Sequence, residues 1–209
     1  MGPTERIEAR LNGVARDLTT RMLTGRGWAV AAMTTPGGLG AFISSSAADV
    51  TDRTVPLGPA LGADEAALLR QIVAQPDEAS RVAVLAGFLE QALKPQRTPA
   101  ARLVAEVARL TETNRGVRRL SQLCAAVGIG QRSLQRLFLQ HAGVSPTWVL
   151  RRYRLLEAAE AVRNGEQVSW AHVAAELGYA DQAHLTRDFR AAIGKTPAAY
   201  AHSQAARYR

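Results

Sequence analysis

The 209-residue sequence is poor in the side chains that build metal sites and covalent cross-links. It has one cysteine, Cys124, and four histidines with no close spacing. A single cysteine excludes an intramolecular disulfide and a zinc site made of cysteines. No glycine-rich phosphate loop, paired-carboxylate motif or cysteine–histidine arrangement stands out. We therefore expect no metal, no cofactor and no enzymatic activity.

The sequence also lacks a long hydrophobic run. None approaches the roughly 20 apolar residues needed to cross a bilayer, and the N-terminus has no apolar stretch typical of a secretory signal. Hydrophobic residues nevertheless make up 47% of the chain and charged residues 21%, which favours a packed core over disorder. These features predict a cytoplasmic protein without a membrane partner.

Lysine is rare throughout, and acidic residues are rare in the second half. Lys94 and Lys195 are the only lysines, so the other 24 basic residues are arginines. Residues 1–96 hold 9 basic and 10 acidic groups, whereas residues 97–209 hold 17 and 8. A genome rich in G and C also favours arginine, but it does not explain this asymmetry. The asymmetry predicts a nucleic-acid-binding domain joined to a neutral region.

Residues 1–95 are expected to form a small α+β region. Its β-rich part is placed at 20–62, with short strands at Trp28–Met33 and from Phe42, separated by a turn at Thr35–Gly38. Apolar residues at helical spacing predict two helices over 63–94, and Pro76 is assigned to the first turn of the second helix.

A linker with two prolines, Lys94–Pro99, is the expected boundary between this region and a second domain. Thr98 is the expected cap of the helix that follows. The second domain, which we interpret as DNA-binding, is placed at 97–209.

An internal repeat of about 50 residues occupies the basic half of the chain. Identical residues recur at offsets of 50 or 51: Ala125/Ala175, Gly128/Gly178, Leu134/Leu185, Arg136/Arg187, Phe138/Phe189, Gly143/Gly194 and Pro146/Pro197. Each copy has the pattern of a helix-turn-helix, in which a glycine accepts the positive φ of the turn. The two copies are placed at about 120–141 and 170–192.

The second helix of each copy presents polar side chains opposite its apolar face. Steps of about 100° from Leu134 or Leu185, the centres of the buried sides, place these side chains outside or on the flank. Arginine pairs with guanine, glutamine with adenine, and an alanine methyl contacts that of thymine. The candidate DNA-binding residues are Arg132, Gln135 and Arg136 in the first copy and Gln182, Ala183, His184, Thr186 and Arg187 in the second.

A predicted helix of about 17 residues, about 25 Å long, joins the two copies. It begins at Pro146 and ends before Gly165. Such a helix would hold the two reading helices near one turn of DNA apart, about 34 Å. The candidate phosphate contacts are Arg151, Arg152 and Arg154 on this helix and Arg190 in the second copy.

These residues resemble the AraC family of bacterial transcription regulators. The resemblance covers roughly 98–201 and is carried by both copies of the repeat, by Ser133–Phe138, by Arg154-Leu155 and by Gly178–Phe189 with Gly194–Pro197. It implies a mainly α fold, in which a seven-helix, homeodomain-like domain contains two helix-turn-helix units. It also implies RNA polymerase as a partner. Gly130 departs from the family pattern, which usually has a serine cap there, and Cys124 stands where alanine is usual.

Residues 20–62 are similar to the latter part of a β-rich sensor domain found upstream in some of these regulators. The similarity rests on Gly25–Trp28 and Pro36–Gly38. It implies a small-molecule effector bound by the N-terminal region, although this region is shorter than the usual sensor. The helices at 63–94 fit either a homodimer interface or a core that packs on this region.

The leading interpretation is a sequence-specific transcription regulator that reads two successive major-groove segments of double-stranded DNA with two recognition helices. The alternative is a nonspecific or architectural DNA-binding protein without an intact effector site. A repair enzyme with a reactive cysteine is disfavoured, because Cys124 lies in a predicted helix-turn-helix core and is more typical of an inert, packed thiol.

Overall fold

The structure is a computed structural model that describes residues 7–20, 22 and 26–205. These residues cluster into two compact units. Unit 1 comprises 1–14, 21–105 and 139–143, and unit 2 comprises 15–20, 106–138 and 144–209, each as far as it is described. The division falls inside helices α4 (Thr98–Thr113) and α6 (Gln131–Ala142), so both helices contribute residues to each unit.

Unit 1 contains a small antiparallel sheet. Strand β1 (Arg10–Asn12) pairs with β2 (Thr54–Pro56), and Leu11 lies opposite Val55. Two 3-10 helices, η1 (Gly38–Ala41) and η2 (Ala47–Val50), lie between the strands in sequence. The buried core around these elements consists of Leu11, Ile43, Ala47, Val50 and Leu61.

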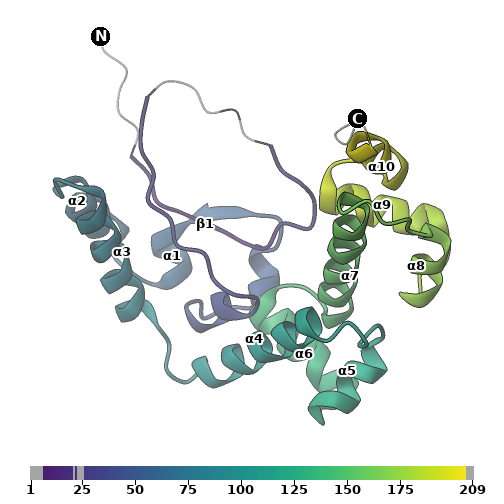
Figure 1. Cartoon of the computed structure of the whole chain (residues 1–209). Coiled ribbons are helices and arrows are strands. Elements are labelled where there is room, and N and C mark those ends of the chain that lie inside the picture. Colours follow the sequence, from purple (N-terminus) through teal and green to yellow (C-terminus); the bar gives the residue numbers. More distant parts are fainter. Residues whose placement is uncertain (1–6, 21, 23–25, 206–209) are drawn as a thin grey trace. The chain divides into compact units, whose positions relative to one another are not determined.

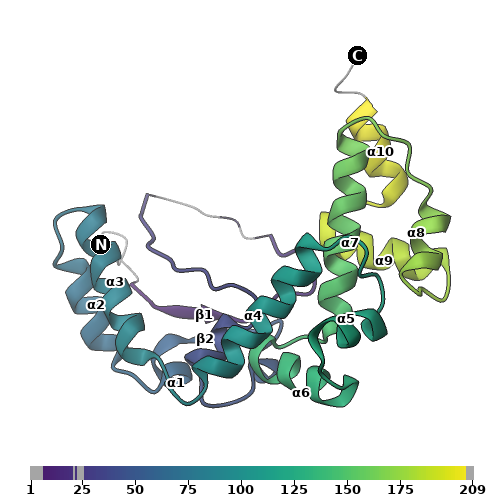
Figure 2. The same cartoon turned by 60° about the horizontal axis from the view of Figure 1, so that its bottom comes forward.

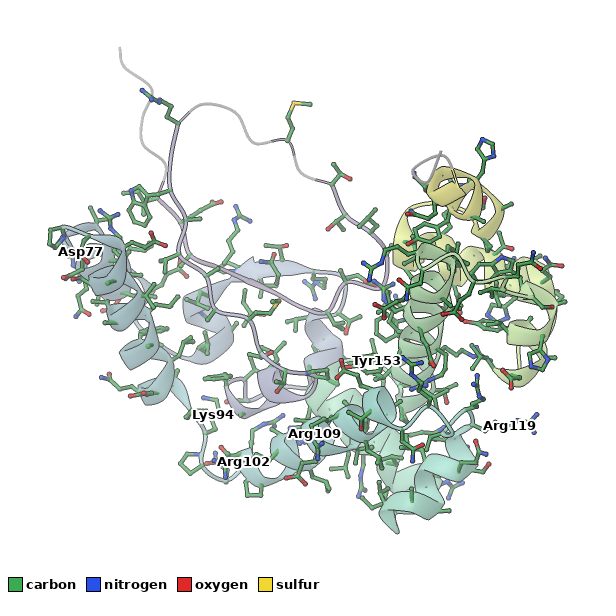
Figure 3. All side chains as sticks on the ribbon, viewed as in Figure 1. Asp77, Lys94, Arg102, Arg109, Arg119 and Tyr153 are labelled. Atoms are coloured by element: carbon green, nitrogen blue, oxygen red, sulfur yellow. The ribbon has the colours of Figure 1, made fainter. Side chains whose placement is uncertain are left out.

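Three helices follow β2 in unit 1, namely α1 (Leu57–Leu61), α2 (Glu65–Val73) and α3 (Glu78–Ala92). The carboxylate of Asp64 accepts a hydrogen bond from the Ala67 amide at 3.0 Å, and that of Asp77 accepts one from the Ser80 amide at 2.8 Å. These bonds cap the first turns of α2 and α3. Figure 3 labels Asp77 at the start of α3 and Lys94 just beyond its end. The two helices occupy the stretch in which apolar periodicity predicts helices.

The two short strands predicted in the N-terminal region are not formed. Trp28–Met33 has no regular secondary structure, and Phe42 follows η1 instead of opening a strand. The Trp28 ring is half exposed and is covered by the guanidinium of Arg81 at 4.2 Å. A short apolar run is stable as a strand only beside a partner, and among the described residues β1 and β2 form the one strand pair.

The description of 20–62 as β-rich is therefore wrong for its described residues, in which β2 is the one strand. Gly25, part of the motif similar to a sensor domain, lies outside the described residues. The predicted turn at Thr35–Gly38 is formed: the Gly38 amide donates to the Thr35 carbonyl at 2.9 Å, and Gly37 has a φ of 85°.

Two predicted helix starts differ in detail. Pro76 precedes Asp77, the cap of α3, so Pro76 lies outside the helix instead of in its first turn. The aspartate is the better cap, because its carboxylate can accept from an amide of the first turn. Thr98 is the first residue of α4, and its hydroxyl donates to the Lys94 carbonyl at 3.1 Å.

His141 is a buried histidine in unit 1, 3% exposed, near the end of α6. It packs so closely on Gly40 that a Cβ at that glycine would overlap it. Its Nδ1 has no hydrogen-bond partner within the described part of the chain. Burial lowers the pKa of His141, and the positive charge of Arg97 lowers it further. Arg97 itself is held by the carbonyls of Gly40, Ser44 and Ser45 at 2.8 to 3.0 Å.

Seven helices lie within the described residues 98–205, and all contribute to unit 2. Besides α4 and α6 they are α5 (Leu120–Val127), α7 (Pro146–Arg163), α8 (Trp170–Glu176), α9 (Gln182–Ile193) and α10 (Pro197–Ala205). The mainly helical fold and the small N-terminal α+β region are as predicted.

Helix α7 is the central helix of unit 2. It contacts α5, α9 and α10, which lie around it in Figures 1 and 2. The Ser145 hydroxyl caps it by accepting from the Trp148 amide at 3.1 Å, and Pro146 occupies the first turn. Gly165, with a φ of 86°, follows its end. Both ends of this helix lie where the sequence predicts them.

Candidate nucleic-acid interface

Helices α5 and α6 form a first hairpin with a short glycine turn. The side-chain oxygen of Gln122 accepts from the amides of Arg118 and Arg119 at 2.9 and 3.0 Å, which fixes the start of α5. Figure 3 labels Arg119 beside this start. Gly128 ends the helix with a φ of 67°, a value that side chains with a Cβ rarely adopt. The Gly130 carbonyl accepts from the Leu134 amide and so begins α6.

The first reading helix, α6, has one apolar and one polar face. Leu134 and Phe138 are completely buried. Arg132 and Arg136 are exposed, and Gln135 is half-buried. The first hairpin therefore presents two arginines to solvent with a glutamine between them, which is the arrangement expected from the helical steps.

Helices α8 and α9 form the second hairpin. Gly178, with a φ of 66°, follows α8, and the Asp181 carboxylate caps α9 by accepting from the His184 amide at 2.7 Å. Leu185 and Phe189 of α9 are completely buried. The Phe189 ring packs on Trp170 of α8 in a T-shaped contact, with ring centroids 4.9 Å apart. The two hairpins thus have the same pattern: a glycine with positive φ, followed by a helix with a buried leucine and a buried phenylalanine.

The polar face of α9 is less rich in long side chains than that of α6. Gln182, Ala183 and Arg187 are exposed, whereas Thr186 is half-buried and donates its hydroxyl to the Gln182 carbonyl at 2.8 Å. His184 is half-buried, because its ring packs against Tyr179 with centroids 5.0 Å apart. Three of the five candidate residues in this hairpin are thus fully presented to solvent.

The candidate phosphate-binding arginines of α7 have different surroundings. Arg154 is buried, with 2% of its side chain exposed, so its prediction as a phosphate contact is wrong. Its guanidinium donates to Glu157 at 2.6 Å and to the Thr111 carbonyl of α4. Burial lowers the pKa of Arg154, and Glu157 opposes that effect. The error arises because helical steps cannot show that α4 covers this side of α7.

Arg151 and Arg152 are both half-buried. The guanidinium of Arg151 donates to backbone carbonyls in the turn of the second hairpin. That of Arg152 lies 5.7 Å from the centroid of the Trp148 ring. Burial lowers the pKa of Arg152, and the nearby carboxylate of Asp17 opposes that effect. Arg190 of α9, in contrast, is exposed.

Two ion pairs inside unit 2 that the sequence did not indicate join the stretch before α5 to α7 and to the second hairpin. Arg118, just before α5, donates to Glu176 of α8 at 2.8 Å. Arg115 lies 3.1 Å from Glu157, the partner of Arg154. These pairs lie between residues far apart in sequence, so no spacing rule would find them.

A family of helix-turn-helix domains of the AraC type matches residues 123–203, which include α6 to α9 and most of α5 and α10. Residues 123–203 are an AraC-type helix-turn-helix domain. The chain also matches a curated relative, the HTH-type transcriptional activator RhaS of Escherichia fergusonii. The identity is 36% over 66 residues, or 32% of this chain and 23% of RhaS. The chain thus aligns with under a quarter of the relative, and no solved structure gives a significant match.

These matches place the AraC-type domain among the DNA-binding domains of transcription regulators. Cys124 in its first hairpin is a free, half-buried thiol. The described residues contain no group of three or more His, Cys, Asp or Glu side chains placed to hold a metal ion. They also contain no helix that is both long and apolar enough to span a membrane.

Proposed function

We propose that this chain is a sequence-specific transcription regulator that reads two successive major-groove segments of double-stranded DNA with α6 and α9. The observation that carries the proposal is the pair of hairpins whose candidate reading residues lie in one unit, each with polar side chains exposed opposite a buried leucine and phenylalanine. A helix of this kind can enter the major groove with its polar face toward the base edges.

The exposed side chains are suited to reading bases. Arg132 and Arg136 of α6, and Arg187 of α9, can each bond both acceptors of a guanine edge, and Gln135 or Gln182 can bond an adenine. The Ala183 methyl can contact only a thymine methyl. We therefore expect α6 to specify more base pairs than α9, with Thr186 and His184 as secondary contacts.

The charge of the second half supports a polyanionic partner. Residues 97–209 contain 17 basic and 8 acidic groups. Arg190 is exposed and, within the described residues, makes no bond to a backbone carbonyl of the kind that engages Arg151. Arg190 is therefore our first candidate for a phosphate contact, followed by Arg152. Affinity should fall steeply with salt, because each neutralised phosphate releases bound counterions.

The alternative, nonspecific or architectural binding, is favoured by one feature of unit 1. Its described residues contain a two-stranded sheet, which is too small to enclose a ligand as a β-barrel does. We still predict three partners for the chain. They are a small-molecule effector, a second copy of the chain bound through α2 and α3, and RNA polymerase. The cytoplasmic location and the lack of enzymatic activity also stay predictions, which we infer from the DNA-binding class of the domain.

Selection from random duplexes distinguishes the two functions. The full chain is incubated with a pool of random-sequence DNA near physiological salt, and bound duplexes are amplified over several rounds. A sequence-specific regulator enriches a motif with two parts about one helical turn apart, about 10 base pairs from centre to centre. An unenriched pool, bound with the same salt dependence, would establish the architectural alternative.

A further inference from the structure

Arg151 projects from α7 onto the turn of the second hairpin, although it lies on the helix that carries the candidate phosphate contacts. Its Nη2 donates to the Gly178 carbonyl at 2.9 Å, and its Nε donates to the Leu177 carbonyl at 3.4 Å. Its guanidinium lies over the Tyr179 ring, 4.4 Å from the centroid. One side chain therefore contacts three consecutive residues of the turn.

The two carbonyls are groups that need a partner. Leu177 and Gly178 follow the last turn of α8, where carbonyl oxygens lack amides from a following helical turn. The planar fork of arginine can satisfy both at once, and its positive charge also complements the negative end of the helix dipole. A lysine would supply the charge but not the fork.

Tyr179 continues the contact from the turn to the reading helix. It is buried, and its ring meets the His184 ring of α9 in a T-shaped contact, with centroids 5.0 Å apart and planes at 79°. Burial raises the pKa of Tyr179, and the negative charge of Asp188 on α9 raises it further, so the phenol is neutral. The ring thus lies between Arg151 of α7 and His184 in the first turn of α9.

We propose that Arg151 is a positioning residue for the second reading helix and does not serve as a phosphate contact. It fixes the turn at Leu177–Tyr179 relative to α7, and through the Tyr179 ring it fixes the first turn of α9, which carries Gln182 and Ala183. The inference rests on the proposed function, because it concerns how α9 reads DNA.

The same geometry predicts which property of binding changes when Arg151 is lost. A phosphate contact contributes about 0.9 to the slope of log affinity against log salt and carries no base preference. A positioning residue leaves that slope unchanged and alters discrimination only among the bases that its helix reads. Salt slope and base preference therefore separate the two roles.

The test compares Arg151→Ala with Arg190→Ala, which removes an exposed arginine from α9. Both full-length variants are titrated against the selected duplex and against duplexes with one base pair changed in either part of the motif, at several salt concentrations. For wild type we expect a change in the part read by α9 to weaken binding about tenfold. For Arg151→Ala we expect less than about threefold there, unchanged discrimination in the part read by α6, and the wild-type slope. Arg190→Ala should keep both discriminations and lose about 0.9 of the slope.

Three further variants keep the test decisive if Arg151→Ala unfolds, which circular dichroism would reveal. Tyr179→Leu removes the ring and should reproduce the loss of discrimination, whereas Tyr179→Phe keeps the ring and should retain it. Arg151→Lys keeps the charge and should not restore discrimination. A reduced salt slope with intact discrimination in Arg151→Ala, or full rescue by lysine, would overturn the proposal. Failure of the wild-type chain to enrich any motif would instead refute the proposed function.

Discussion

Arginines that are close neighbours on α7 differ in role because their surroundings differ. Arg154 is enclosed by α4 and bonds to a carbonyl and a carboxylate, Arg151 is bound to the turn of the second hairpin, and Arg152 lies beside Trp148. A guanidinium engaged by internal acceptors has fewer donors left for a phosphate. Among these arginines, the role of each side chain therefore depends on the groups that it contacts and not on its residue type.

Arg136 is the residue for which a direct role in base reading is most easily tested. It is exposed on α6, at the position equivalent to Arg187 in the repeat. Arg136→Ala should weaken binding to the selected duplex by about 1–3 kcal/mol and should relax preference at one base pair. Titration against a set of single-base variants measures both effects. Arg163→Ala, at an exposed position near the end of α7, is the matched control and should bind as wild type does. Unchanged affinity of Arg136→Ala for its best site would show that α6 is placed wrongly.

His141 should make stability depend on pH. The unfolded chain takes up the imidazole proton at an ordinary pKa near 6.5, whereas the buried, Arg97-facing side chain in the folded state takes it up only at lower pH. Between these two pKa values the unfolded state binds more protons, so the free energy of unfolding falls as pH falls. The contribution of neutral His141 to the free energy of unfolding is fully retained above about pH 6.5.

Urea unfolding between about pH 7.5 and pH 5 measures this effect. His141→Leu should remove that part of the pH dependence, while His172→Leu, at a position 71% exposed in its side chain, should leave it in place. A wild-type slope in His141→Leu would assign the dependence to another group.

Individual helices in this protein begin and end through local chemistry, but they are held together by distant contacts. Ser145 and Asp181 cap α7 and α9 through their own side chains. In contrast, α7 is joined to α4 by the bond from Arg154 to the Thr111 carbonyl, and the region before α5 is joined to α8 by Arg118 and Glu176. Caps thus fix where a helix begins, whereas these contacts hold the helices of unit 2 together.

Arg154→Met should therefore destabilise unit 2 more than the loss of an exposed pair would. The change leaves the Thr111 carbonyl without this donor and leaves Glu157 paired with Arg115. We expect a loss of about 3 kcal/mol in the free energy of unfolding, within the range for broken buried pairs. Arg163→Met breaks an exposed pair with Glu160 on the same helix and should cost less than about 1 kcal/mol. Equal losses in urea unfolding of the two variants would contradict this reasoning.

At the scale of the molecule, the repeat makes two reading helices available in one unit. Both hairpins contact α7 or its neighbours, and the candidate reading residues of both belong to unit 2. Each helix is expected to read its own base pairs, and within the described residues no hydrogen bond or ion pair joins the candidate residues of α6 to those of α9. Their contributions to affinity should therefore be independent.

The double variant Arg136→Ala/Arg187→Ala tests this independence. Its loss of binding free energy should equal the sum of the two single losses within about 0.5 kcal/mol, since well-separated sites add. The measurement is titration against the selected duplex at one salt concentration. A double loss no greater than the larger single loss would mean that only one helix engages DNA at a time.

The sequence by itself determined the features that depend on short stretches of chain. Glycines with positive φ, caps and apolar periodicity are local, so the repeat, both ends of α7 and the polar faces of α6 and α9 could be predicted from the residues alone. The resemblance of this part of the chain to the AraC family rested on the same residues, and a match to AraC-type helix-turn-helix domains covers residues 123–203.

Only the tertiary structure decided which side chains the neighbouring elements cover. Arg154 lies on a flank of α7 that α4 covers, and His184 lies on a flank of α9 that the Tyr179 ring covers. Trp28–Met33 has the composition of a strand but has no partner strand among the described residues. The physical reason is that burial and strand pairing are set by residues far away in sequence, whereas helix boundaries are set by residues within one turn.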